Sequence, residues 1–376
     1  MDWRIPLANL DYGDQETEAV NRVLQSKWLT MGAVTQQFEA EFASFIKCSY
    51  AIAVSNATQA LHLACLAIGI GPGDEVIVPS MSFVATANAV LYCGADVRFA
   101  DIISPKELTI DPQSIIENIT SKTKAIIVMH YAGYPCRMPE IMQIAEDHRL
   151  AVIEDAAHAP GATLEGNSLG TWGDVGCFSF FSNKNLSTGE GGMITTNRDD
   201  IAAKVKLQRS HGMTSLTYDR HKGHAFSYDV VELGYNYRID EIRSALGIEQ
   251  LKKLPENNAK RGKLTEMYWE DLASINIGLP FSELNHGRSS YHIFPVILPE
   301  TADRHTFMTG LRDAGIQSSI HYRPIHTFTY YQNKFGKVNL PITEQVGRRE
   351  VTLPLYPTMG EEKLNLVVGQ VGELLS

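Results

Sequence analysis

Apolar runs alternate with amphipathic segments between Tyr50 and Thr196. Short apolar runs indicate buried strands, and apolar residues spaced three or four apart are typical of helices packed on a sheet. We predict strands at Ala51–Val54, Glu75–Pro79, Val97–Asp101, Ala125–Met129, Ala151–Asp155, Cys177–Phe181 and Met193–Thr196. We predict helices at Thr58–Ile68, Val84–Tyr92 and Pro139–His148. This alternation predicts an α/β fold with a mostly parallel sheet.

A second, smaller domain is predicted after the charge-rich stretch LKKLPENNAKRGK, which begins at Leu251. New strand and helix signals follow at His292–Leu298, His305–Ala314 and Ser318–Tyr322. We therefore expect an N-terminal arm and large α/β domain over residues 1–253 and a smaller α+β domain over 254–376, a division that suits a chain of 376 residues.

Composition argues against several classes of protein. No apolar run approaches the roughly 18 residues of a membrane span, and the N-terminus lacks the basic start and apolar core of a secretion signal, so we expect a cytoplasmic protein. The five cysteines show no CxxC pair or Cys/His ligand spacing, which argues against a disulfide framework and a zinc site. A net charge of −10 disfavours nucleic acid as a partner.

Two segments that follow predicted strands are suited to holding a planar anionic ligand. In SNATQAL, Ser55 and Asn56 follow a strand and Thr58 opens a helix, where free N–H groups can bind phosphate. An alternative is that Thr58 only caps the helix. Phe83 follows the next strand and could stack on a flat ring, although core packing is the commoner fate of a phenylalanine.

A third segment, AVIEDAAHAPGA, is an apolar strand that ends in Glu154 and Asp155, with His158 close behind. A carboxylate at the buried end of a strand is costly unless a cation or several donors meet it. A protonated pyridine nitrogen is one such cation, and the carboxylate would keep that ring electron-withdrawing. The alternative is that Asp155 caps a turn and His158 is a packing residue.

The fourth segment, FSFFSNKNLSTGEGGMITT, places Lys184 between an apolar run and a glycine-rich turn. Such lysines are usually exposed ammonium groups. If Lys184 is desolvated, however, its pKa falls, and the neutral amine can form a Schiff base with an aldehyde cofactor and carry protons once it is displaced. The order of the four segments is phosphate-type turn, aromatic ring, acid and lysine.

With these residues the chain resembles the DegT/DnrJ/EryC1/StrS family of pyridoxal-phosphate-dependent sugar aminotransferases. The resemblance covers almost the whole chain. Its landmarks are WLTMG (28–32), SNATQALHLA (55–64), GDEVIVPSMSFVATANAV (73–90), EDAAHAPGA (154–162), FSFFSNKNLSTGEGG (178–192), RSHG (209–212), GYNYRIDEIRSALG (234–247) and HYRPIH (321–326).

The resemblance implies the fold type I architecture of aspartate aminotransferase, and pyridoxal 5'-phosphate as the cofactor, with a pyridoxamine phosphate form. By that resemblance Lys184 forms the internal aldimine, Asp155 pairs with the pyridine nitrogen and His158 neighbours the ring hydroxyl. Phe83 would stack on the ring.

Further cofactor contacts are implied in the same way. The phosphate would be held by Ala57, Thr58 and Ser179, although the family commonly has glycine where this chain has Ala57. Asn236 would reach into the neighbouring subunit's site, which implies a homodimer with shared active sites.

The implied reaction takes an amino group from L-glutamate and gives it, in a second half-reaction, to a nucleotide-linked 3-keto or 4-keto deoxysugar, as in amino sugar and polysaccharide biosynthesis. A keto cyclitol is the alternative acceptor. Thr30, Tyr322 and His326 lie in segments that the resemblance puts near the sugar. The loop RHKGHA, with Arg220, His221 and Lys222, could meet the diphosphate across the dimer interface or could be a solvated basic loop.

Three rival functions remain. A pyridoxal-phosphate sugar dehydratase shares the fold but has histidine in place of the lysine, so Lys184 argues against it. A nicotinamide oxidoreductase is disfavoured because no GxGxxG follows the first strand. A non-enzymatic regulator would keep the lysine but show no turnover.

Overall fold

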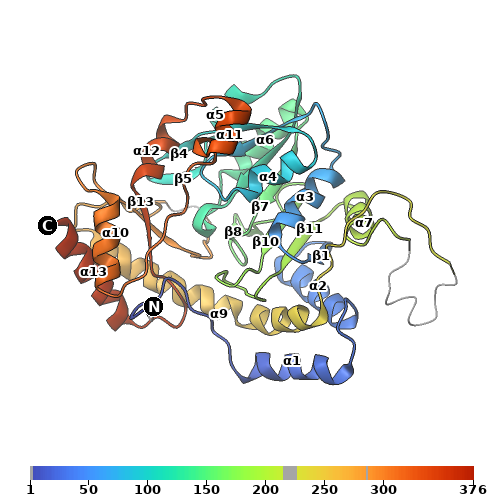
Figure 1. Cartoon of the computed structure of the whole chain (residues 1–376), viewed down its shortest axis with the longest axis horizontal. Coiled ribbons are helices and arrows are strands. Elements are labelled where there is room, and N and C mark those ends of the chain that lie inside the picture. Colours follow the sequence, from blue (N-terminus) through green and yellow to red (C-terminus); the bar gives the residue numbers. More distant parts are fainter. Residues whose placement is uncertain (1–2, 215–226, 285–286) are drawn as a thin grey trace.

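The computed structural model describes residues 3–214, 227–284 and 287–376 (Figure 1). Its centre is a seven-stranded sheet in the order β1-β11-β10-β7-β6-β2-β3. The strands of this sheet are β1 (Tyr50–Val54), β2 (Glu75–Pro79), β3 (Asp96–Ala100), β6 (Thr123–Met129), β7 (Ala151–Asp155), β10 (Val175–Ser179) and β11 (Gly192–Thr196).

The sheet contains both parallel and antiparallel pairs of strands. The pairs β2–β3, β2–β6, β6–β7 and β7–β10 are parallel, whereas β11 runs antiparallel to both β10 and β1. The α/β fold with a mostly parallel sheet is therefore confirmed. β10 ends at Ser179 instead of continuing to Phe181, whose side chain is 45% exposed.

Helices cover both faces of the sheet. The helices of this part of the chain are α1 (Asp14–Ser26), α2 (Ala33–Ile46), α3 (Ala57–Ala67), α4 (Ala85–Tyr92), α5 (Pro112–Asn118), α6 (Met138–His148), α7 (Asp199–Gln208) and α9 (Glu241–Leu272). Apolar residues of α2, α5, α6 and α9 pack in one cluster, and those of α3, α4 and α7 pack in another.

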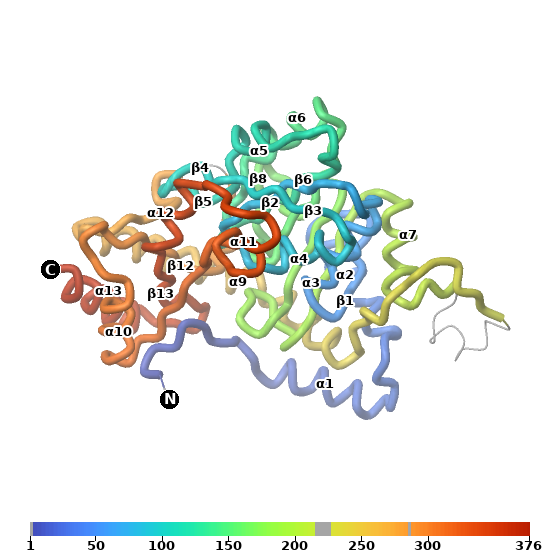
Figure 2. Tube along the Cα trace, turned by 45° about the horizontal axis from the view of Figure 1, so that its top comes forward, coloured from blue at the N-terminus to red at the C-terminus, as the bar shows by residue number. Residues whose placement is uncertain are grey.

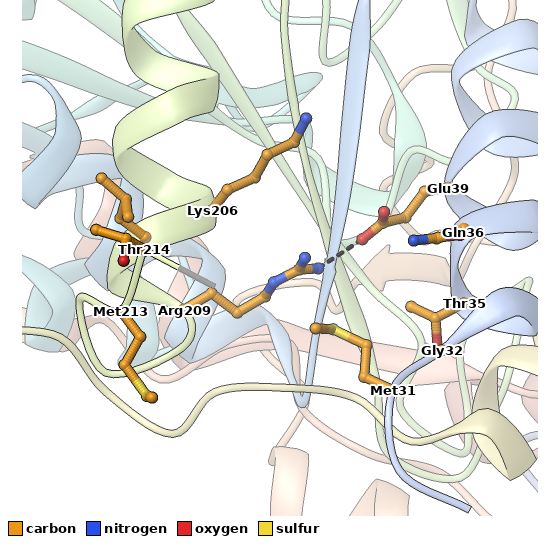
Figure 3. Close-up of a pocket in the computed structure, with 10 residues that line it drawn as sticks. Met31, Gly32, Thr35, Gln36, Glu39, Lys206, Arg209, Met213 and Thr214 are labelled. Atoms are coloured by element: carbon orange, nitrogen blue, oxygen red, sulfur yellow. Dashed lines mark hydrogen bonds and ion pairs between the residues drawn. The ribbon is translucent and has the colours of Figure 1, made fainter. Parts of the chain in front are cut away.

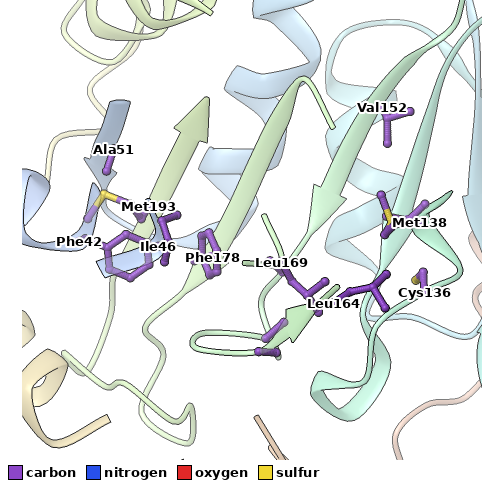
Figure 4. Packing of buried hydrophobic residues seen from close by; sticks show 14 of the residues in the cluster. Phe42, Ile46, Ala51, Cys136, Met138, Val152, Leu164, Leu169, Phe178 and Met193 are labelled. Atoms are coloured by element: carbon purple, nitrogen blue, oxygen red, sulfur yellow. The ribbon is translucent and has the colours of Figure 1, made fainter. Parts of the chain in front are cut away.

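Successive strand residues alternate between these two layers because side chains along a strand point to opposite faces. Phe178 belongs to the first cluster and its neighbour Cys177 to the second. Figure 4 shows Phe178 beside Phe42, Ile46 and Met193 in the first cluster. Since both faces are buried, the strands read as continuous apolar runs in the sequence.

The C-terminal part has its own apolar cluster, formed between β12, β13, α10, α13 and the end of α9. The remaining elements are β4 (Ile102–Ser104), β5 (Glu107–Ile110), β8 (Thr163–Leu164), β9 (Asn167–Ser168), β12 (Phe294–Ile297), β13 (Glu350–Leu353), α10 (Arg304–Asp313), α11 (Thr329–Phe335), α12 (Pro341–Arg349) and α13 (Glu361–Leu375), with short 3-10 turns at Tyr131–Gly133 and Ile325–Thr327.

Two segments connect the large sheet with the C-terminal part. Helix α9 runs beneath both (Figure 1) and continues through residue 254, so the division at that residue stays a prediction. The N-terminal arm returns beside the C-terminal part (Figure 2), where Ile5 forms a bridge with Ile316 and joins its core. The predicted strand at Ser318–Tyr322 is reduced to a single bridge between Ser319 and Thr352.

None of the helices in the described ranges combines the length and the hydropathy needed to cross a bilayer.

Candidate active site

A cavity of about 620 Å³ opens at the carboxyl ends of the parallel strands, where open α/β sheets bind ligands. Its volume falls in the range of roughly 300–1,000 Å³ that small-molecule sites occupy. Eight of the predicted site residues line it together: Ala57, Thr58, Phe83, Asp155, His158, Ser179, Lys184 and Tyr322.

Lys184 lies on the loop that follows β10 and lines this cavity. Its Nζ is 3.3 Å from His292 Nε2. Burial lowers the pKa of Lys184 from 10.5 to about 8, while the negative charge of Asp155 acts in the opposite direction. Near neutral pH the amine can therefore lose its proton readily, as a lysine that attacks an aldehyde must.

Asp155 ends β7 and is only 4% exposed. Its Oδ2 accepts a hydrogen bond from Thr86 Oγ1 at 2.7 Å, and its Oδ1 accepts one from Ala157 N at 3.2 Å. Burial raises the pKa of Asp155, and these two hydrogen bonds together with Lys184 oppose that rise. Both hydrogen-bond donors are neutral groups, so a positive charge placed in the cavity would stabilise the carboxylate.

The adjacent carboxylate, Glu154, points to the other face of β7. It is fully buried and accepts hydrogen bonds from the backbone N–H groups of Gly170, Trp172 and Gly173 at 2.7, 2.7 and 2.8 Å, and lies 3.0 Å from His130. The chain thus satisfies Glu154 internally, whereas Asp155 faces the ligand cavity.

His158 and Tyr322 form a neutral pair beside Asp155. His158 Nδ1 accepts the backbone N–H of Ala132 at 3.3 Å, so the neutral ring carries its proton on Nε2, which lies 2.9 Å from the Tyr322 hydroxyl. Burial lowers the pKa of His158 well below its ordinary value and raises the pKa of Tyr322. Tyr322 can therefore accept from His158 and donate its own proton toward a ligand.

The amino end of α3 provides an anion site at another wall of the cavity. Asn56 caps the helix by accepting from Gln59 N at 3.0 Å, which leaves the N–H groups of Ala57 and Thr58 directed out of the helix end. Gly192 permits this arrangement, because a Cβ there would lie 2.6 Å from the Asn56 carbonyl carbon.

Phe83 lies at the edge of the cavity and is 56% exposed, so it is not a core residue. Its ring centre is 6.1 Å from that of Tyr322. An apolar ring left in water beside a charged cavity is suited to cover a flat ligand.

Other predicted residues lie elsewhere. Thr30 is exposed and bridges Asp240, and Asn236 is exposed and bridges Ser210. His326 is buried with its Nδ1 2.7 Å from Ser80 Oγ, and it is absent from the cavity walls within the described ranges. Arg220, His221 and Lys222 fall outside the described residues.

Several residues at the site were not predicted. Thr86 supports Asp155, Gln59 and Asn183 line the cavity, and His292 contacts Lys184. Thr86, Gln59 and Asn183 carried a signal, since each lies on a segment already assigned to the site, whereas His292 lies on none of them.

A second cavity of about 340 Å³ lies between α2 and α7. Figure 3 shows Arg209 reaching across it to Glu39, with Arg209 Nη1 2.5 Å from Glu39 Oε1. The same nitrogen donates to Ala53 O at 2.7 Å. Arg209 of the RSHG landmark therefore has a structural role here, joining the end of α7 to α2 and β1.

The residues at the main cavity fit pyridoxal phosphate by their chemistry: a half-buried amine with a lowered pKa for the aldehyde, a buried carboxylate for a charged ring nitrogen and a helix end for the phosphate. Solved structures with this fold include Spr1654 of Streptococcus pneumoniae, described as a putative sugar aminotransferase, in its pyridoxamine phosphate (PMP) form, with a TM-score of 0.93 and 27% identity over 99% of both chains. Helicobacter pylori PseC, an aminotransferase involved in the biosynthesis of pseudoaminic acid, matches with a TM-score of 0.92 and 29% identity over 100% of this chain and 99% of PseC. The fold and site define a pyridoxal-phosphate-dependent aminotransferase.

The family is shown by the sequence comparisons. Residues 11–372 match the model of the DegT/DnrJ/EryC1/StrS aminotransferase family. The spore coat polysaccharide biosynthesis protein SpsC of Bacillus subtilis is 36% identical over 371 residues, which is 96% of this chain and 95% of SpsC. The chain belongs to the DegT/DnrJ/EryC1/StrS aminotransferase family.

Proposed function

We propose that this sugar aminotransferase moves the amino group of L-glutamate to a nucleotide-linked keto deoxysugar, with the ketone at C3 or C4, in two half-reactions at one site. The observation that carries the proposal is that Lys184 and Asp155 line one cavity. The pKa of Lys184 is lowered, and Asp155 is buried with two hydrogen-bond donors that are both neutral. Relatives named for sugars and polysaccharides support the sugar as acceptor.

Each residue has a role that follows from its chemistry. Pyridoxal phosphate, when bound, supplies an aldehyde that takes up an amino group and a ring that withdraws electrons. Asp155 would hold the ring nitrogen in its charged form, and the N–H groups of Ala57 and Thr58, with Ser179, would hold the phosphate.

Lys184 is the acid and base of the reaction. Its Nζ, once free, would remove the proton from the α-carbon of the amino donor and return it to the carbon on the other side of the nitrogen, a 1,3-proton shift, and the reverse shift would serve the keto sugar. A pKa of about 8 suits both directions, because each protonation state is accessible near neutral pH. Tyr322 and His158, which contact each other, form the cavity wall beside it.

We further propose a homodimer with shared sites. Val230, Val231 and Leu233 are 55%, 55% and 78% exposed, and they lie directly before the exposed Asn236. A second copy that covered these side chains would bury apolar surface and bring Asn236 to the other subunit's cavity. Arg220, His221 and Lys222 of the neighbouring segment would then meet the diphosphate of the nucleotide, while Thr30 and Tyr322 would act near the sugar. His326, whose ring is held by Ser80, would not contact the sugar.

The test begins with the purified protein. It should be yellow, borohydride should fix the cofactor to the peptide that contains Lys184, and L-glutamate should bleach the colour. The bleached form is then offered nucleotide-linked 3-keto and 4-keto sugars, free keto sugars and keto cyclitols, with recovery of the colour as the readout. Failure to bind the cofactor, or recovery with cyclitols alone, would refute the proposal.

A further inference from the structure

A buried histidine from the C-terminal part contacts the reactive lysine. His292 is 3% exposed and lies just before β12, and its Nε2 is 3.3 Å from Lys184 Nζ. The backbone N–H of His292 donates to Ala132 O at 2.9 Å, and the backbone N–H of Ala132 donates to His158 Nδ1. The backbone that carries the ring is therefore tied to the segment that also holds His158.

The position of the proton on this ring follows from its other neighbour. His292 Nδ1 is 2.8 Å from Asn185 Oδ1, and Asn185 Nδ2 donates to the backbone carbonyl of Ser290 at 2.7 Å. A carbonyl can only accept, so the amide nitrogen of Asn185 must face Ser290 and its oxygen must face His292. Nδ1 of His292 therefore carries the proton, and Nε2 of the neutral ring keeps its lone pair.

The orientation of Asn185 is fixed in turn by α9. Asn258 Nδ2 donates to the carbonyl of Pro160 at 2.9 Å, which leaves Asn258 Oδ1 to accept from Asn185 Nδ2 at 2.8 Å. Asn185 and Asn258 are 6% and 3% exposed. In this series of hydrogen bonds, His292 donates to Asn185, Asn185 to Asn258 and Asn258 to the carbonyl of Pro160. The series leaves the lone pair of His292 Nε2 facing Lys184.

We propose that His292 is a positioning residue for the catalytic lysine: its Nε2 accepts a hydrogen bond from Lys184 Nζ and holds the amine at the cavity whenever that amine is free. The inference rests on the proposed role of Lys184, but not on the identity of the amino donor or acceptor. Burial, then Lys184 and other positive neighbours, lower the pKa of His292 well below its ordinary value, so the ring stays a neutral acceptor.

The expected consequence concerns the protonated form of Lys184. Among titratable groups, Asp155 acts on Lys184 and favours the ammonium, while the positive charge of Lys184 in turn helps to lower the pKa values of His158, His292 and His321 around it. An acceptor on Nε2 stabilises the ammonium. Its removal should lower the pKa of Lys184 by about one unit, a tenfold change in the protonation equilibrium.

The test measures that pKa in the cofactor-free full-length protein. Trace acetylation with acetic anhydride is carried out between pH 6 and 10, and the modified Lys184 peptide is quantified by mass spectrometry. The wild type should show a midpoint near about 8. His292→Asn can keep the contact with Asn185 but is too short to reach Lys184, whereas the amide of His292→Gln reaches it.

We expect the midpoint to fall by about one unit in H292N and to stay within roughly 0.3 unit of the wild type in H292Q. Equal midpoints in wild type and H292N would overturn the proposal, and so would an equal fall in both variants. If H292N does not fold, ¹⁵N NMR of the histidine rings in the wild type decides: a neutral Nδ1–H ring is expected, and an Nε2–H or charged ring overturns the proposal.

The inference and the proposed function can fail separately. The labelling midpoint is read without amino donor or acceptor, so a protein inactive with every keto sugar can still show the H292N shift. Conversely, full aminotransfer with unchanged midpoints would leave the function standing and remove the role of His292.

Discussion

Replacing Lys184 with methionine should stabilise the cofactor-free protein. The lysine is held in a site that lowers its pKa from 10.5 to about 8, a difference of about 2.5 units. At about 1.4 kcal/mol per unit, keeping the charged ammonium in the folded protein at pH 7 costs roughly 3.5 kcal/mol. Because part of the side chain faces the cavity and its water, we take this figure as an upper bound and expect a gain of about 2–3 kcal/mol.

The pH dependence distinguishes this effect from simple apolar packing. Below pH 8 both the folded and the unfolded chain carry the proton, so the full penalty applies. As the pH rises from about 8 to about 10.5, the folded chain gives up the proton before the unfolded chain does, and the penalty disappears. The advantage of Lys184→Met should therefore be largest below pH 8 and shrink toward pH 10.5.

The assay is urea unfolding of cofactor-free wild type and variant at several pH values, followed by circular dichroism. Lys263→Met is the matched control, since Lys263 is 71% exposed on α9 and its loss should change the unfolding free energy by less than about 0.5 kcal/mol. A K184M protein no more stable than the wild type at pH 7 would refute the reasoning, as would a gain that is constant with pH.

Three further outcomes are expected. Thr86→Val removes a hydrogen bond to Asp155 and should lower kcat roughly tenfold, while Thr86→Ser should not; equal kcat values would contradict this. Glu39→Gln breaks the pair between the half-buried Glu39 and the buried Arg209 and should cost about 3 kcal/mol in thermal unfolding, whereas Glu18→Gln, at an exposed position of α1, should cost almost nothing. Phe83→Ala should weaken cofactor binding about tenfold in equilibrium dialysis yet leave the cofactor-free protein as stable as before, and a loss of stability instead would mean that the ring is part of the core.

The large sheet could be predicted from the sequence because both its faces are buried, so each strand is a distinct apolar run between helices. The site residues at the strand ends could also be predicted, since Asp155 ends one apolar run and Lys184 lies on the loop after another. Their meeting in one cavity follows from the parallel direction of the strands.

His292 could not be found in this way. It lies more than a hundred residues after Lys184 in an apolar stretch, where a histidine is commonly a packing residue, and its role depends on the path of the chain through the C-terminal part. His326 shows the opposite case: it belongs to a motif near the site, but its ring turns toward Ser80. Side-chain direction in irregular segments has no periodic signal in the sequence.

The reversed direction of β11 determines how the loop with Lys184 is tethered. Ser179 pairs with Gly192, so the loop leaves and re-enters the sheet at the same edge. Phe180 N donates to Gly191 O at 2.9 Å, and Thr188 N to Phe180 O at 2.9 Å, which tie its two ends together. A parallel β11 would have required a crossover over the face of the sheet and would have carried this segment away from the ligand. Because β11 is antiparallel, the loop is short and is anchored to the sheet at both ends. The side chain of Lys184 could therefore leave and rejoin the cofactor while its backbone stays at the site.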